Sequence, residues 1–300
     1  MPIPVGKKRS SAHAAGDFSH NAAFPPVVLI TGASSGFGEA CAQHLGTKGY
    51  RVYGTSRRAT WNPDARQNSP GTASCQLIPM DVCDTASVDA GVDTVLKTAG
   101  RIDVVICNAG FGLAGSVEDS TVQEAKRQFE TNFFGTWRVC RAALPHLRRQ
   151  KSGYLVIVGS LAGVMGIPFQ AAYSSSKFAL EGMAEALRME VKPWGVRVVL
   201  IEPGDFRTGF TRNRIKSAAS GTNPDYAANF ARALAVMEKA ERQGPSPEKI
   251  ARLVARIITH PAPRLRYTTG TMSQRFGALL KRVLPGRLFE WLMMATYKLN

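Results

Sequence analysis

The fold is decided by the stretch Val27-Val28-Leu29-Ile30-Thr31-Gly32-Ala33-Ser34-Ser35-Gly36-Phe37-Gly38. Its first part, Val27 to Thr31, is a short β-branched and apolar run, which is typical of a buried parallel strand. The glycines behind it allow a tight turn, and a helical pattern follows from Gly38 to Gly49. A glycine turn alone fits a structural loop equally well, but its place between a first strand and a helix favours phosphate binding by backbone N–H groups.

Outward from this stretch, short apolar runs alternate with helical patterns. Further strands are predicted at 51–55, 76–79, 104–107, 154–158 and 196–201, and helices at 85–99, 121–150, 172–194, 226–242 and 250–259. Alternating β and α elements predict an α/β fold, a single-domain Rossmann-type doubly wound parallel sheet with helices on both faces. No solenoid repeat or low-complexity linker divides the sequence.

Three segments differ from this pattern. Residues 1–24 are rich in small and polar residues without hydrophobic periodicity, which predicts a flexible amino-terminal extension. One dinucleotide-binding domain is predicted over 25–270, and its loosely patterned part at 205–245 is expected to act as a carboxyl-terminal substrate lid. Segment 271–300 is basic and amphipathic, and we expect it to pack on the domain, on a partner subunit or on a membrane surface.

Composition narrows the class of protein. The 38 Lys and Arg exceed the 22 Asp and Glu, but this charge is spread along the chain and no nucleic-acid-binding signature accompanies it, so we expect no nucleic-acid partner. Five cysteines without a CxxC pair predict free thiols, and the histidines form no metal-ligand spacing, so no metal is expected. Without an apolar run of signal or membrane-spanning length, the sequence predicts a soluble cytoplasmic protein, with membrane association open only through its carboxyl-terminal segment.

The choice of dinucleotide is read from the end of the second predicted strand. Arg57 and Arg58 stand there, where a dinucleotide fold contacts the adenosine ribose. An acidic residue at this point would repel a 2′-phosphate, whereas arginine offers it charge-assisted hydrogen bonds. NADP(H) is therefore predicted as the preferred cofactor and NAD(H) remains possible, because two arginines also fit a solvated turn.

Tyr173 and Lys177 lie four residues apart on one face of a predicted helix. A free phenol titrates at about 10 and is a poor acid or base at neutral pH. A nearby cation would stabilise the phenolate and lower the pKa of Tyr173. Such a pair is also a common surface contact, so its catalytic use stays a hypothesis until other motifs are considered.

Those other motifs occur in a fixed order around the pair. They are TGASSGFG at 31–38, Asp81-Val82, Asn108-Ala109-Gly110, Asn132, Ser160, and Pro203-Gly204 with Thr208. Over residues 26–210 the chain therefore resembles the short-chain dehydrogenase/reductase family. The resemblance implies a catalytic tetrad of Asn132, Ser160, Tyr173 and Lys177. It also implies a set of cofactor-binding residues, namely Gly32, Ser34, Ser35, Gly36, Phe37, Gly38, Arg57, Arg58, Asp81, Val82, Asn108, Ala109, Gly110, Tyr173, Lys177, Pro203, Gly204 and Thr208.

The resemblance implies a role for each member of the tetrad. Tyr173 is the expected general acid in carbonyl reduction or base in alcohol oxidation, and Ser160 orients the substrate oxygen. Lys177 is expected to tune Tyr173 and hold the nicotinamide ribose, and Asn132 to position a water. Ser35 is not basic, unlike the residue there in some NADP-using relatives, so the phosphate assignment depends on Arg57 with Arg58 as an auxiliary.

The sequence thus predicts an NADP(H)-dependent oxidoreductase acting on a ketone, aldehyde or secondary alcohol. Asp205-Phe206 resembles a subset of relatives that act on steroids, retinoids or other lipophilic carbonyls, which favours a lipophilic small-molecule substrate. The alternative is a dinucleotide-sensing binding or regulatory protein on the same fold. Because relatives commonly pair through the helices that contain Asn132 and Tyr173, a homodimer or homotetramer is expected.

Overall fold

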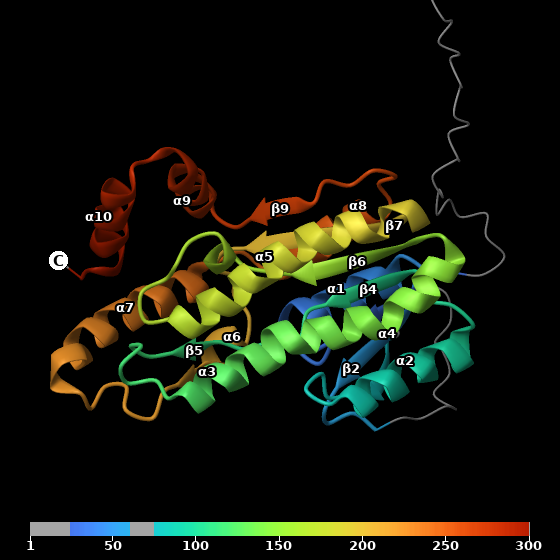
Figure 1. The fold of residues 1–300 in the computed structure, drawn as a ribbon, viewed down its shortest axis with the longest axis horizontal. Coiled ribbons are helices and arrows are strands. Elements are labelled where there is room, and N and C mark those ends of the chain that lie inside the picture. The colour runs from blue at the N-terminus through green and yellow to red at the C-terminus, as the bar shows by residue number, and fades with distance from the viewer. Residues whose placement is uncertain (1–24, 61–74, 300) are drawn as a thin grey trace, which may run out of the picture.

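The computed structural model describes residues 25–60 and 75–299 and centres on one parallel sheet (Figure 1). Within these residues, seven strands are hydrogen-bonded in the order β3-β2-β1-β4-β6-β7-β9. Every neighbouring pair is parallel, which requires a crossover connection between the strands. The strands are β1 (Val27–Ile30), β2 (Arg51–Ser56), β3 (Cys75–Pro79), β4 (Val104–Cys107), β6 (Gly153–Val158), β7 (Val196–Pro203) and β9 (Arg266–Thr269).

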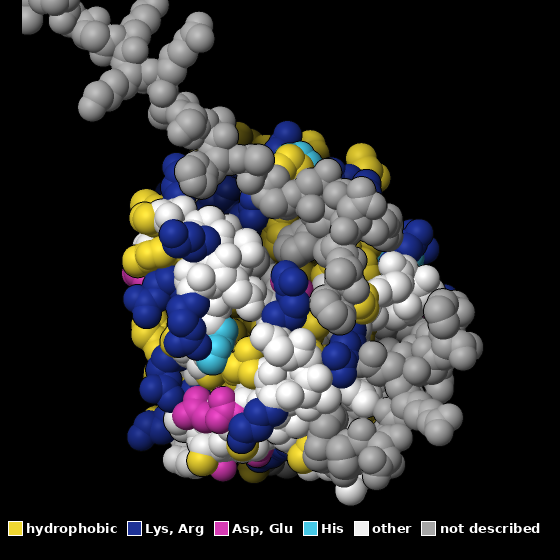
Figure 2. Space-filling view, turned by 90° about the vertical axis from the view of Figure 1, so that its right-hand side faces the viewer, with side chains coloured by type: hydrophobic (Ala, Val, Ile, Leu, Met, Phe, Trp, Pro, Cys, Tyr) yellow, Lys and Arg dark blue, Asp and Glu magenta, His cyan; other side chains and the backbone are white. Residues whose placement is uncertain are grey.

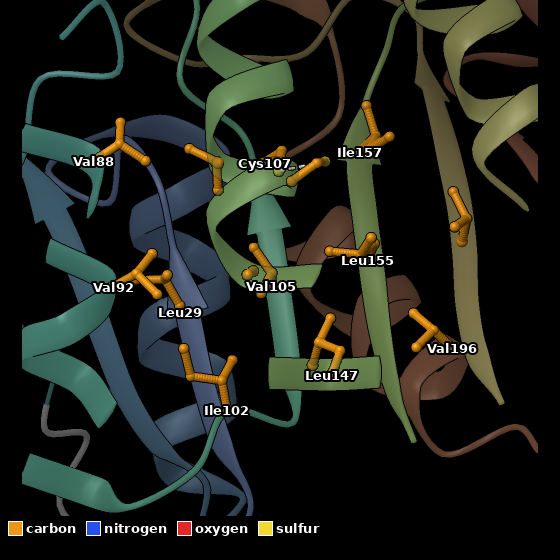
Figure 3. Packing of buried hydrophobic residues seen from close by; sticks show 14 of the residues in the cluster. Leu29, Val88, Val92, Ile102, Val105, Cys107, Leu147, Leu155, Ile157 and Val196 are labelled. Carbon is orange, nitrogen blue, oxygen red and sulfur yellow. Dashed lines mark hydrogen bonds between the residues drawn. The ribbon is translucent and has the colours of Figure 1, made fainter. Parts of the chain in front are cut away.

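Helices bury both faces of the sheet in two separate cores. On one face, side chains of α2 (Thr85–Ala99), α4 (Gly135–Gln150) and α5 (Ala171–Val191) pack against the strands. Figure 3 shows Val88 and Val92 of α2 beside Leu29, and Leu147 of α4 beside Leu155. On the other face, α1 (Gly36–Thr47) and α8 (Glu248–Ile258) form the second core. The predicted single-domain doubly wound sheet is therefore confirmed.

The prediction of one continuous α-helix over 121–150 is wrong in its middle. A capping box of Thr121 and Glu124 starts α3 (Val122–Phe129), as expected for a helix amino terminus. A π-helical segment, Glu130–Phe134, then separates α3 from α4, and the Gly135 N–H donates to the Glu130 carbonyl five residues back. Such a bulge leaves hydrophobic periodicity almost unchanged, so the sequence pattern does not reveal it.

The chain after β7 contains the predicted helix at 226–242, seen as α7 (Pro224–Gln243), and two short elements that the sequence did not predict, α6 (Phe210–Asn213) and β8 (Ile215–Lys216). Strand β8 pairs in parallel with β5 (Leu113–Ala114). The edge strand β9 was also missed, because its sequence, Arg-Tyr-Thr-Thr, lacks an apolar run. Two further helices, α9 (Met272–Val283) and α10 (Gly286–Tyr297), lie beyond it.

The helix pair α9 and α10 is anchored by a small core of its own. Ala278 of α9 and Phe289 of α10 pack with Leu161 and Met165, which follow β6. In Figure 1 the pair lies at the end of the sheet where β9 finishes, above α7. The predicted division at residues 24 and 270 remains a prediction, and its amino-terminal extension, 1–24, lies outside the described residues.

Positive side chains are dispersed over the face of the molecule that Figure 2 shows. Figure 2 shows one end of the molecule, where Lys and Arg lie among hydrophobic and other side chains instead of forming one continuous patch. In the part of the chain that the structure describes, no helix has the length and hydropathy needed to cross a bilayer.

Candidate active site

The order of the strands creates a crevice between β1 and β4. From β1 the chain continues to β2 and β3 on one side, whereas β4, β6 and β7 follow on the other. The carboxyl ends of β1 and β4 therefore diverge at the point where an open α/β sheet binds its ligands. Thr31 and Asn108 are the first residues beyond these two strands.

Thr31 and Asn108 fix the glycine loop to the end of β4. The Thr31 hydroxyl accepts hydrogen bonds from the backbone N–H groups of Asn108 (2.9 Å) and Ala109 (3.0 Å). In return, the Asn108 amide donates to the backbone carbonyls of Thr31 (3.0 Å) and Gly32 (3.1 Å). The loop conformation is thus held from two strands at once.

Two glycines in this loop are required by geometry. Gly32 has φ +66°, a conformation that favours glycine, and a Cβ on Gly38 would lie 2.3 Å from the Gly32 carbonyl oxygen. Helix α1 starts at Gly36, and its N-cap residue Ser35 makes no side-chain capping hydrogen bond. The N–H groups of the first helical turn therefore remain available to an anion.

A cleft of about 830 Å³ runs along these strand ends. It is lined by the predicted cofactor-binding residues except Gly38, which instead packs beneath the loop. Ser160, which follows β6, and both Tyr173 and Lys177 of α5 line the same cleft. The structure thus places the glycine loop and three of the four predicted tetrad residues around one space.

Tyr173 is buried at the substrate end of the cleft, and its ring lies 5.6 Å from that of Phe210. Burial raises the pKa of its phenol to about 12. The Ser160 hydroxyl lowers this pKa, the nearby carboxylates of Asp205 and Glu241 raise it, and the Arg214 guanidinium lowers it. The phenol is therefore protonated at neutral pH, which is the form that can donate a proton.

Lys177 lies beside the Tyr173 ring, and its hydrogen bond is made to the backbone of β6. Its ammonium donates to the Val158 carbonyl (2.8 Å) and lies 5.8 Å from the centre of the Tyr173 ring. Burial lowers the pKa of Lys177 to about 8. The expected lowering of the Tyr173 pKa by this cation is outweighed here by burial of the phenol.

Asn132 is buried in the π-helical segment and does not line the cleft. Its side-chain carbonyl accepts from the Phe111 N–H (3.1 Å), and its amide donates to the Phe111 carbonyl (3.1 Å) and to the Ser176 hydroxyl (3.3 Å). The side chain therefore holds the loop after β4 against α5. These contacts give it a positioning role next to Gly110, whose absent Cβ would lie 3.0 Å from the Asn132 Oδ1.

The substrate end of the cleft contains groups that the sequence did not reveal. Asp205 accepts a hydrogen bond from the Gln274 amide (2.6 Å), and the Gln274 carbonyl accepts from the Asp205 N–H (3.3 Å). Gln274 belongs to α9, and Tyr297 of α10 also lines the cleft. Since 69 residues separate Asp205 from Gln274, no local pattern could have identified this contact.

Besides the Lys177 ammonium, three buried or largely buried groups carry charge near Tyr173. Glu241 of α7 pairs with Arg214 and also accepts from the Thr211 hydroxyl (2.5 Å). The pKa of Asp205 is raised to about 6, chiefly by burial and also by the Glu241 carboxylate, while Arg214 and the hydrogen bond from Gln274 oppose the shift. Two carboxylates and one guanidinium leave a net charge of 1 − 2 = −1 when all three groups are ionised.

No cluster of three or more metal-ligating side chains that could hold an ion occurs in residues 25–60 and 75–299. Hydroxyl, phenol, ammonium and carboxylate groups line the described site.

Comparisons with known proteins agree with this geometry. Residues 26–219 match the short chain dehydrogenase family. The chain is 41% identical to a 3-ketodihydrosphingosine reductase of Bacteroides thetaiotaomicron, over 92% of this chain and 99% of that protein. It is 36% identical to human 17-beta-hydroxysteroid dehydrogenase type 1, over 85% and 80% of the respective chains.

A solved alcohol dehydrogenase from the archaeon Thermococcus sibiricus, complexed with 5-hydroxy-NADP, is 25% identical with a TM-score of 0.65. The alignment covers 82% of this chain and 97% of that one. The predicted likeness to relatives acting on steroids and other lipophilic carbonyls is confirmed by these matches. The chain belongs to the short-chain dehydrogenase/reductase family of oxidoreductases.

Proposed function

We propose that this protein is an NADP(H)-dependent reductase of lipophilic ketones in which Tyr173 is the general acid. The observation that carries the proposal is the protonated phenol of Tyr173, buried beside Ser160 at the end of a cleft that begins at a phosphate-binding type of glycine loop. The phenol carries its proton at neutral pH, which is the form that reduction of a ketone requires. The dinucleotide-sensing alternative has no comparable support.

The residues divide the chemistry between them. Bound nicotinamide would supply the hydride, and the chain's own groups handle the proton. Ser160 orients the ketone oxygen, and Tyr173 donates a proton to that oxygen as it gains negative charge. Lys177, held on the Val158 carbonyl, places a cation beside the phenol and faces the cleft, where it would hold the nicotinamide ribose.

A dinucleotide fits the residues of the cleft. The first turn of α1 offers uncapped N–H groups for the pyrophosphate, and Asp81 and Val82 line the region proposed for the adenine. Arg57 and Arg58 are exposed at the end of β2 and line the same cleft. Their two positive charges support a site for the 2′-phosphate of NADP(H).

Replacing Arg57 by Ala is expected to weaken NADPH binding about 10- to 100-fold, because a charge-assisted contact contributes roughly 1.5–3 kcal/mol. NADH lacks the 2′-phosphate, so its affinity should change by less than about two-fold. Cofactor titration followed by fluorescence measures both constants, and Arg58→Ala serves as the matched variant. Equal losses for NADPH and NADH would contradict the assignment of Arg57.

The substrate proposed is a long-chain ketone with a positively charged group near the carbonyl. 3-Ketodihydrosphingosine, the compound in the name of the Bacteroides relative, carries an amino group next to its ketone. The carboxylates of Asp205 and Glu241, which lie near Tyr173, supply negative charge that would attract such an ammonium. Glu241 is already paired with Arg214, so Asp205 is the carboxylate proposed to contact it.

Asp205→Asn is expected to lower kcat/KM for a 2-amino ketone about 10- to 100-fold, because it removes the charge from a charge-assisted hydrogen bond. Asparagine retains an oxygen that can accept from Gln274. In the wild type, kcat/KM for the amino ketone should fall as the pH drops through about 6, where Asp205 gains a proton. Rates of NADPH oxidation against pH measure both effects.

The same ketone without its amino group is the control for Asp205. Its kcat/KM should change little in Asp205→Asn. In the wild type, protonation of Asp205 near pH 6 should not lower kcat/KM for this ketone. Equal effects of the substitution on both ketones would contradict recognition of an ammonium.

The proposal includes a substrate lid, an oligomeric state and a cellular location. Segment 205–245 is proposed as the substrate lid, since Phe210, Met237 and Glu241 from it line the cleft. A homodimer or homotetramer is proposed to form through α4 and α5, where Phe134, Trp137 and Phe178 are between 44% and 52% exposed. Five free cysteines support a reducing, cytoplasmic location.

The decisive experiment follows NADPH and NADH absorbance with a panel of long-chain ketones, amino ketones and the corresponding alcohols. We expect NADPH-dependent reduction of long-chain ketones, with the amino ketone reduced most efficiently. Cofactor binding without turnover of any member would favour the dinucleotide-sensing alternative.

A further inference from the structure

The helix pair α9 and α10 exposes an unusual amount of apolar surface. Of the fifteen large hydrophobic side chains exposed in the described residues, seven belong to these two helices, which together hold 12 + 12 = 24 residues. Monomeric proteins seldom expose apolar side chains in such a concentration unless they bind a partner or a membrane. The seven exposed residues of this surface belong to α9 and α10, not to α4 and α5, the helices proposed for subunit pairing.

On α9 the exposed residues form one stripe. Met272, Phe276, Leu279 and Val283 are spaced by four, three and four residues, and each is more than half exposed. This spacing places them on one side of the helix. Ala278 packs in the core beneath the helix, so the stripe faces away from the domain.

On α10 a second exposed set repeats the arrangement. Leu288, Trp291 and Met294 follow at three-residue intervals and are exposed, whereas Phe289 is buried and Met293 packs with it. Both helices thus pack against the domain with one face and present a second, apolar face outward.

The charges around these stripes are almost all positive. Segment 271–299 carries Arg275, Lys281, Arg282, Arg287 and Lys298 against the single acidic Glu290, a net charge of 5 − 1 = +4. Apolar stripes flanked by cations are the pattern of helices that lie in the interface of an anionic bilayer. A second copy of the same face would bring two sets of like charges together, so the charge argues against self-pairing here.

The position of the helices relative to the cleft adds a second argument. Gln274 of α9 bonds to Asp205, and Tyr297 of α10 lines the substrate end of the cleft. A further hollow of about 670 Å³, lined by Ile167, Phe178 and Phe289 among others, lies between α10 and the start of α5. Apolar surface therefore continues from the exposed helices towards the catalytic end of the molecule.

We propose that α9 and α10 form a docking surface for an anionic lipid bilayer. The stripes enter the boundary between headgroups and acyl chains, and the flanking Lys and Arg contact lipid phosphates. Each helix has 12 residues, well short of the roughly 20 needed to span a bilayer, so the contact is peripheral. Binding of this kind does not depend on which ketone the enzyme reduces.

The test is flotation of the full chain with phosphatidylcholine vesicles, with and without phosphatidylglycerol. We expect binding to the anionic vesicles to exceed binding to neutral ones by at least about ten-fold and to fall with added salt. The double variant Phe276→Ser/Trp291→Ser and the charge reversal Arg282→Glu/Arg287→Glu should each weaken binding by about ten-fold or more.

Val117→Ser/Val122→Ser is the matched control, because these side chains are 75% and 72% exposed next to α3, at a distance from α9 and α10. It should bind vesicles like the wild type. Circular dichroism and turnover of a water-soluble ketone confirm that each variant is folded. Failure of the wild type to float, or unchanged flotation of both test variants, would overturn the proposal.

Sedimentation of the protein without vesicles completes the experiment. Loss of oligomers in Phe276→Ser/Trp291→Ser, together with absence of vesicle binding by the wild type, would identify the surface as a contact between copies instead. Activity on the water-soluble ketone is measured separately, so failure of the membrane proposal leaves the proposed reductase function standing, and the reverse also holds.

Discussion

The Tyr173→Phe enzyme is expected to reduce ketones about 10²- to 10⁴-fold more slowly than the wild type, which is the usual contribution of a positioned general acid. Phenylalanine retains the aromatic ring that packs 5.6 Å from Phe210, so the fold and the shape of the cleft should persist. NADPH should bind with nearly unchanged affinity, since the loss concerns proton donation. Single-turnover kinetics with saturating NADPH separate the chemical step from binding.

The pH dependence provides an independent check on Tyr173. Its pKa of about 12 means that the acid form is already present at neutral pH, so Tyr173 should not limit reduction there. Alcohol oxidation needs the phenolate. At pH values below the pKa of Tyr173, the phenolate fraction increases about ten-fold for each unit by which the pH is raised. Oxidation by the wild type should therefore increase with pH, and Tyr173→Phe should remove this increase. A variant that reduces ketones at the wild-type rate would contradict the mechanism.

Arg266→Ala is expected to lower the free energy of unfolding by about 3–5 kcal/mol, the usual effect of removing one partner from a buried ion pair. Arg266 of β9 donates to Glu181 (2.7 Å) and Glu185 (2.5 Å) of α5, and its Nε lies 3.5 Å from a carboxylate oxygen of Glu202. Glu202 is 1% exposed, so its charge cannot be stabilised by water once the guanidinium is gone.

The loss of stability in Arg266→Ala should grow as the pH rises. Burial already raises the pKa of Glu181 to about 7, and Arg266 opposes this shift. Without Arg266, the pKa of Glu181 in the folded protein rises further above its pKa in the unfolded chain. The stability that is present at acid pH is therefore lost as the pH rises through the folded-state pKa of Glu181. Denaturant titration at several pH values measures this dependence.

Arg197→Ala is the control for Arg266. Arg197 is a nearby arginine on β7 whose side chain is partly exposed and donates to the carbonyls of Pro261 (2.7 Å) and Gly195 (3.2 Å), so its removal leaves no buried carboxylate. We expect a loss of about 1 kcal/mol or less. A similar loss for both variants would contradict the role given to the carboxylates around Arg266.

The proximity of the glycine loop to Asn108 could be predicted, although 76 positions separate Gly32 from Asn108, because each follows a parallel strand of the sheet. The glycine loop lies directly behind β1, and Asn108 lies directly behind β4. Parallel strands bring their carboxyl ends to one edge, so the order of the motifs implies their proximity. Tyr173 and Lys177 were predictable for a similar reason, since four residues correspond to about one helical turn.

The parts of the site and fold that the sequence did not predict depend on contacts between segments that are distant in the chain. The Gln274 bond to Asp205 and the pairing of Arg214 with Glu241 link residues 69 and 27 positions apart, and neither belongs to a periodic pattern. Strand β9 was missed because polar and aromatic residues at a sheet edge do not resemble a buried strand. The raised pKa of Tyr173 arises from burial by Phe210 and its neighbours, which only the folded chain shows.

The Gln274 to Asp205 hydrogen bond also relates the order of synthesis to the order in which the site becomes complete. The glycine loop, Tyr173 and Lys177 have all been made before Asp205 emerges, and Gln274 follows 69 residues later. At about 5–20 residues per second, that separation corresponds to roughly 3–14 seconds on the ribosome. During this interval the nascent chain contains every residue of its proposed nucleotide-binding half, while the carboxylate at the substrate end still lacks the helix that restrains it.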